Sequence, residues 1–136
     1  MIEDRINNIL EDLNMFDDDI DKYEYIVDVG KNLPNLDESL QRDEFLVKGC
    51  TSKVWLIAEY SNGVINLKAD SNSVIVKGLA SILITVFQDL EPEEIVNYNI
   101  DGLEKLGLTE IISPTRQNGV YHMVNKIKHY AELYKE

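Results

Sequence analysis

The stretch that decides the fold runs from residue 54 to residue 67 and reads VWLIAEYSNGVINL. Two runs rich in β-branched and aromatic residues, 54–57 and 64–67, stand on either side of Asn62-Gly63. An Asn-Gly pair between such runs is a strong hairpin signal, because both residues accept the positive φ angles of a tight turn. The stretch therefore predicts two short antiparallel strands.

Helical patterns follow this hairpin. Residues 74–90 are apolar almost all round, so we expect a helix that begins at a Ser71 or Asn72 cap and packs against the sheet. Pro92 suits the first turn of a further helix, and residues 101–106 predict a short one. After turn signals at 113–114 and 118–119, apolar positions within residues 120–134 predict a terminal amphipathic helix.

Two more helices are predicted before the hairpin. Apolar residues at spacings of three and four predict a helix over residues 2–13. A second helix has candidate caps at residues 17–19 and ends before Pro34. The order of helices, hairpin and helices lacks the alternation of a parallel sheet, so the expected class is α+β. We expect one domain over residues 1–136, with a short antiparallel sheet flanked by helices.

Charge and hydropathy narrow the classes of function. The chain has 136 residues with 13 basic and 25 acidic side chains, a net charge of -12, and residues 1–44 hold 14 of the acids against four bases. Such a charge repels nucleic acids. No apolar stretch approaches the ~20 residues of a membrane span, and the acidic start is unlike a signal peptide. We expect a cytoplasmic protein that binds another protein or a small molecule.

The local feature that suggests chemistry is a lone cysteine in the segment VKGCTSKVW, residues 47–55. A single cysteine forms no internal disulfide and is often a small buried hydrophobe. Its small polar neighbours instead indicate a turn, and Lys48 and Lys53 would favour the thiolate of Cys50, since no acid lies between Phe45 and Ala58. A structural cysteine and a reactive one are both compatible with this pattern.

Other kinds of site have little support. A cysteine hydrolase would need His122 or His129 beside the thiol, but no protease signature is present and both are expected at the surface or its boundary. One Cys and two His do not match zinc or iron–sulfur ligand patterns. Glycine-rich phosphate loops are absent, and the acidic run 17–21 lacks the Gly and Glu of an EF-hand. We expect neither a metal nor a cofactor on this chain.

Several motifs together resemble the SufE-type sulfur-acceptor proteins of iron–sulfur cluster assembly, which include the CsdE proteins. The most specific is Gly49-Cys50-x-Ser52-x-Val54-Trp55. The other matching segments, in chain order, are Tyr23 with Ile26, Gly30-Lys31, Leu33-Pro34, Arg42, Asp70-Ser71, Ile75-Val76-Lys77-Gly78-Leu79, Leu106-Gly107-Leu108, Ser113-Pro114-x-Arg116-x-Asn118-Gly119 and Met123. The resemblance runs nearly end to end.

The resemblance implies a function for Cys50. It would accept sulfur from the persulfide of a PLP-dependent cysteine desulfurase of the SufS/CsdA type and pass it to a SufBCD-type cluster scaffold, while stimulating the desulfurase. PLP would belong to the partner, so this chain would be a sulfur carrier rather than a stand-alone enzyme. The implied fold is shared with IscU-type scaffolds and places Cys50 on a loop at the sheet edge. The chain would be a monomer or a weak homodimer.

The resemblance also suggests which residues contact the desulfurase. They are Lys48, Thr51, Ser52, Lys53 and Arg116. Thr51 stands where many family members have Gln, and Arg116 either contacts the partner or stays within the turn 113–119. Trp55 is expected in the core.

Two other functions remain as alternatives. The chain could be an interaction module that activates a desulfurase without sulfur transfer through Cys50, or a cysteine hydrolase that uses one of the histidines.

Overall fold

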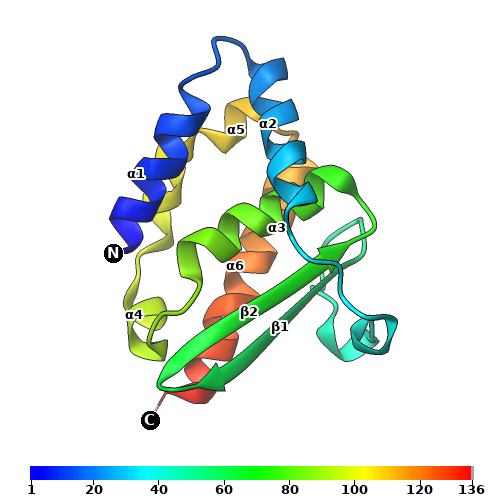
Figure 1. Ribbon diagram of the computed structural model, residues 1–136, viewed down its shortest axis with the longest axis vertical. Coiled ribbons are helices and arrows are strands. Elements are labelled where there is room, and N and C mark those ends of the chain that lie inside the picture. The colour runs from blue at the N-terminus through cyan, green and yellow to red at the C-terminus, as the bar shows by residue number, and fades with distance from the viewer. Residues whose placement is uncertain (136) are drawn as a thin grey trace.

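The computed structural model describes residues 1–135, and it confirms the α+β class with a two-stranded antiparallel sheet flanked by helices (Figure 1). The elements in chain order are α1 (Ile2–Leu13), α2 (Asp19–Lys31), the 3-10 helices η1 (Glu38–Leu40) and η2 (Asp43–Phe45), β1 (Val54–Ser61), β2 (Val64–Ser71), α3 (Val74–Phe87), α4 (Pro92–Asn97), the 3-10 helix η3 (Ile100–Leu106), α5 (Leu108–Ile111) and α6 (Pro114–Tyr134). Within residues 1–135, no helix is both long and apolar enough to cross a membrane.

The hairpin is confirmed, and β1 is buried on both of its faces. The strands pair from Val54 with Ser71 to Ser61 with Val64, and the turn residues Asn62 and Gly63 have φ angles of 54° and 80°. One face of β1 joins the main core. On the other face Trp55, which is 9% exposed, packs with Leu36 and Ile57 beneath the segment that contains η1 and η2. Trp55 therefore lies in a small second core, as a core residue was expected to do.

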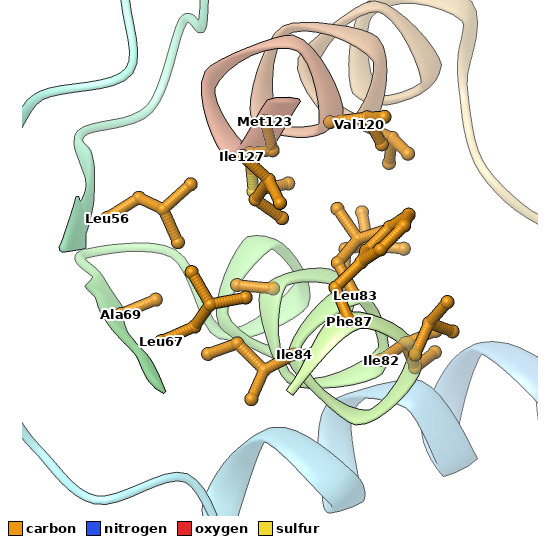
Figure 2. Packing of buried hydrophobic residues seen from close by; sticks show 14 of the residues in the cluster. Leu56, Leu67, Ala69, Ile82, Leu83, Ile84, Phe87, Val120, Met123 and Ile127 are labelled. Carbon is orange, nitrogen blue, oxygen red and sulfur yellow. The ribbon is translucent and has the colours of Figure 1, made fainter. Parts of the chain in front are cut away.

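Helix α3 lies at the centre of the main core, as its apolar sequence predicts. Ten of its fourteen residues are buried. Figure 2 shows Leu56 and Leu67 from the hairpin and Met123 and Ile127 from α6 turned toward it. Its cap is Ser73, three residues before Val76, rather than Ser71 or Asn72. The side chains of those two residues bond to the backbone of Lys53 instead. The hydroxyl of Ser71 donates to its carbonyl, and the side-chain oxygen of Asn72 accepts from its N–H.

The closest helix contact is the crossing of α2 and α3 at two glycines. A Cβ atom on Gly78 would lie 2.1 Å from the carbonyl oxygen of Ile26, and one on Gly30 would lie 2.7 Å from the backbone nitrogen of Gly78. Both obstacles are backbone atoms that cannot rotate away. The two backbones therefore meet at a separation that only glycine permits on both sides.

The predicted start of the terminal helix was wrong. Helix α6 begins at Pro114, and the side chain of Ser113 caps it by accepting from the backbone N–H of Arg116 at 3.2 Å. Residues 118–119, expected as a turn, are helical. A Ser cap followed by Pro at the first position is a complete start signal, and it outweighs the ~1 kcal/mol that one interior glycine costs a helix.

The glycine crossing can be tested with Gly78→Ala. The added methyl group overlaps the backbone of α2, so helix α3 must shift within a closely packed core. We expect the free energy of unfolding in urea to fall by about 2–4 kcal/mol. Thr85→Ala, at an exposed position of the same helix, is the control and should change it by less than about 0.5 kcal/mol. A glycine variant as stable as this control would contradict the close contact.

Candidate functional site

Cys50 lies in the loop of residues 48–53, which is closed at its base by hydrogen bonds. The backbone N–H of Val47 donates to the carbonyl of Val54 at 2.9 Å, and the N–H of Lys53 donates to the side chain of Asn72 at 3.1 Å. Gly49 has a φ of +92°, a conformation that L side chains rarely adopt. The loop is thus anchored at the sheet edge, as expected, and turns sharply just before the cysteine.

The thiol of Cys50 faces the first turns of α6. Its Sγ lies 3.6 Å from the carbonyl oxygen of Gly119, to which it donates a weak hydrogen bond. Cys50 is half-buried, and beside it is a cavity of about 10 Å³ lined by Thr51, Val76, Met123 and other residues of α3 and α6. Such a space holds about one water molecule, so no substrate fits there while the loop stays in place.

Burial controls the protonation of the thiol. It raises the pKa of Cys50 above its ordinary value, because the charged thiolate is disfavoured away from water. In this conformation the effect of burial on the pKa of Cys50 exceeds any stabilisation of the thiolate by Lys48 and Lys53. Both lysines are exposed, so solvent screens their charge, whereas the sulfur is partly desolvated.

Arg116 connects helix α6 to the loop. Its guanidinium donates to the hydroxyl of Ser52 at 2.9 Å, across 64 residues of sequence. The side chain therefore does not stay within the segment 113–119, although its backbone N–H is part of the helix cap. The structure thus brings together Cys50, Thr51, Ser52 and Arg116, while Lys48 and Lys53 lie exposed at the two ends of the loop.

His122, expected at the surface or its boundary, is half-buried and is a neighbour of the loop. A Cβ atom on Gly49 would lie 2.6 Å from its Nε2 and 2.7 Å from its Cδ2, so the imidazole packs directly on the glycine. The thiol hydrogen bond nevertheless goes to Gly119 and not to this ring. His129, seven residues further along α6, is exposed. The Cys–His pair of a cysteine hydrolase is not formed in this conformation.

The basic side chains around the loop lack carboxylate partners. Within residues 1–135, the ion pairs use other lysines and arginines and leave out Lys48, Lys53, Arg116 and Lys126. Burial, and then the neighbouring charge of Lys48, lower the pKa of Lys126. Its ammonium lies 5.3 Å from the ring centre of Tyr130. An acidic protein thus has several basic side chains without ion-pair partners near its only cysteine.

No metal site is recognisable in the part of the chain that the structure describes. Nowhere in residues 1–135 do three or more His, Cys, Asp or Glu side chains gather closely enough to bind an ion.

The raised pKa of Cys50 predicts slow reaction with iodoacetamide at neutral pH. The folded thiol keeps its proton at pH values where the unfolded thiol has already ionised, so the folded rate should rise with pH around a higher midpoint. Alkylation followed by mass spectrometry from pH 6 to pH 10, in buffer and in urea, measures both midpoints. A folded midpoint at or below that in urea would show that burial does not control the thiol.

Comparisons with known proteins agree with the motifs. The SufE family, described as an Fe-S metabolism associated domain, matches residues 7–131. An uncharacterized SufE-like protein of Rhizobium meliloti (strain 1021) is 33% identical over 132 residues, which cover 93% of this chain and 94% of the relative.

A solved structure supports the fold. The solution structure of a hypothetical protein from Thermus thermophilus superimposes with a TM-score of 0.77 at 15% identity, over 95% of this chain and 94% of that one. At this identity the likeness concerns the fold alone. The family match over residues 7–131, together with the 33% identity to the Rhizobium meliloti protein, shows that this chain belongs to the SufE family.

Proposed function

We propose that this protein accepts sulfur on Cys50 from the persulfide of a PLP-dependent cysteine desulfurase of the SufS/CsdA type, stimulates that enzyme, and passes the sulfur to a SufBCD-type scaffold. The observation that supports this most is the placement of the only cysteine. It lies on an anchored surface loop among basic side chains that pair with no carboxylate of residues 1–135. Family membership supports the coarser conclusion, a role in Fe–S metabolism.

The transfer is an exchange between sulfur atoms. The thiolate of Cys50 attacks the outer sulfur of the partner's persulfide, a new S–S bond forms, and the old one breaks. The partner leaves as a thiolate, and Cys50 holds the persulfide. No external oxidant or reductant is needed, because one S–S bond replaces another.

The conformation described here is a resting state in this proposal. Burial keeps the thiol protonated, which protects it from oxidation but also makes it a poor nucleophile. The cavity of about 10 Å³ leaves no room for an incoming persulfide. Sulfur acceptance therefore requires residues 48–53 to lift from α6 when the partner docks, while the bond between Val47 and Val54 keeps the base of the loop closed.

The partner-binding surface consists of the groups around the loop. Lys48 and Lys53 flank the loop. Val74, at the start of α3, is 68% exposed and provides an apolar contact; it stands two residues before Val76, which lines the thiol cavity. An apolar centre with a charged rim is typical of transient protein interfaces. PLP remains with the desulfurase, and the present chain supplies the accepting sulfur.

Sulfur acceptance can be tested by intact mass. After incubation with a desulfurase of this type and cysteine, without reductant, the protein should gain about 32 Da, one sulfur atom. Cys50→Ser should abolish the gain because no other thiol is present. Thr85→Ser, a change of similar size at an exposed position of α3, is the control and should keep it.

The same experiment distinguishes the alternative. If the unmodified protein gains no sulfur and Cys50→Ser still stimulates the desulfurase fully, the protein is an allosteric activator and the proposal fails.

The basic surface predicts an effect of Lys53→Glu on partner binding. Reversing a charge at the rim of an interface lowers mainly the association rate, so we expect about a tenfold slower association with the desulfurase at low salt and a smaller effect at about 0.5 M salt. Lys22→Glu, the same change on α2, is the matched control. Equal rates for the two variants in a stopped-flow or biosensor experiment would show that Lys53 lies outside the interface.

A further inference from the structure

The loop with Cys50 lies antiparallel across one face of α6, and three contacts join them. Ser52 accepts from Arg116 at 2.9 Å, Cys50 donates to Gly119 at 3.6 Å, and Gly49 packs on His122. Positions 116, 119 and 122 are three residues apart, so they follow one another along the same side of the helix. As the residue number falls from 52 to 49 along the loop, its partner on α6 rises from 116 to 122.

These three contacts differ in their ability to hold the thiol in place. The bond from Cys50 to Gly119 is weak, because sulfur is a poor donor and the distance is 3.6 Å. The bond from Arg116 holds Ser52, two residues beyond the cysteine. His122 contacts the residue directly before it, on the side where any other amino acid would have its Cβ. The contact of His122 with Gly49 is thus the nearest packing contact before Cys50.

The imidazole is itself held in position. Besides Gly49 it contacts the ring of Tyr121, with the two ring centres 5.7 Å apart and the planes at 68°. Edge-to-face packing of this kind restricts the orientation of both rings. Gly49 in turn has no side chain to interfere, and its φ of +92° directs the chain across the imidazole.

We propose that His122 is a positioning residue for Cys50: its ring, packed on Gly49, fixes the loop against α6 and keeps the thiol at Gly119. The contact is steric, so the size of the side chain matters and its proton does not. Loss of the ring leaves the base of the loop and the Arg116 bond intact but lets residues 49–50 move away from the helix. This inference rests on the proposed function and deepens it, because it assigns a residue that restrains the sulfur-accepting thiol.

The test is the reactivity of Cys50 in the absence of any partner. We expect His122→Ala to raise the rate of iodoacetamide alkylation at pH 8 about fivefold, because the loop opens more often once this contact is lost. His122→Phe restores a ring without a titratable nitrogen and should return the rate to within about twofold of the unmodified protein. His129→Ala, on the exposed part of the same helix, should leave the rate unchanged.

Two results would overturn the proposal. One is an alanine variant that reacts no faster than the unmodified protein, and the other is a phenylalanine variant that reacts as fast as the alanine variant. Equal urea midpoints for all variants show that a faster reaction comes from the loop and not from global unfolding. Since no desulfurase is present, failure here leaves sulfur acceptance untouched, and a failed sulfur transfer would not change these rates.

Discussion

Helix α3 has almost no face that it can leave in water, and the rest of the structure depends on covering it. Ten of its fourteen residues are buried, so α2, the hairpin and α6 must each occupy a different side. The loop of residues 48–53 connects η2 to β1, and its residues 50–52 lie beside the first turns of α3 and α6. Val76 and Leu79 of α3 line the cavity beside the thiol. Burial of one apolar helix thus determines where Cys50 lies.

Local patterns predicted most of the fold, and the differences occur where two local signals compete. The hairpin and the central helix follow from β-branched runs, an Asn-Gly turn and an apolar segment, all readable within a few residues. Residues 118–119 carried a turn signal, yet they are helical because Ser113 and Pro114 start the helix earlier. The glycine at position 119 also affects the space around Cys50. A Cβ on Gly119 would lie 3.5 Å from Cys50 Sγ and would reduce that space.

The site was predictable only as far as its residues form a contiguous motif. Cys50 and its loop neighbours stand together in the sequence, whereas His122 is 73 positions from Gly49 and no local pattern connects them. Arg116 was identified by its motif, but its bond to Ser52 depends on how α6 packs against the loop. The pKa of the thiol could not be predicted for the same reason: charge can be counted along the chain, while burial appears only after folding.

In the proposed function an acidic protein must receive an anionic sulfur group, and the distribution of charge bears on how it can do so. A net charge of -12 repels thiolates and persulfides at long range. Salt screens such fields within about 8 Å, so an approaching sulfur anion responds mainly to nearby groups. Near Cys50 these are Lys48, Lys53, Arg116 and Lys126, none of them paired with a carboxylate within residues 1–135. In the proposed function, these unpaired basic groups favour the approach of the partner's anionic persulfide more than the net charge of the chain suggests.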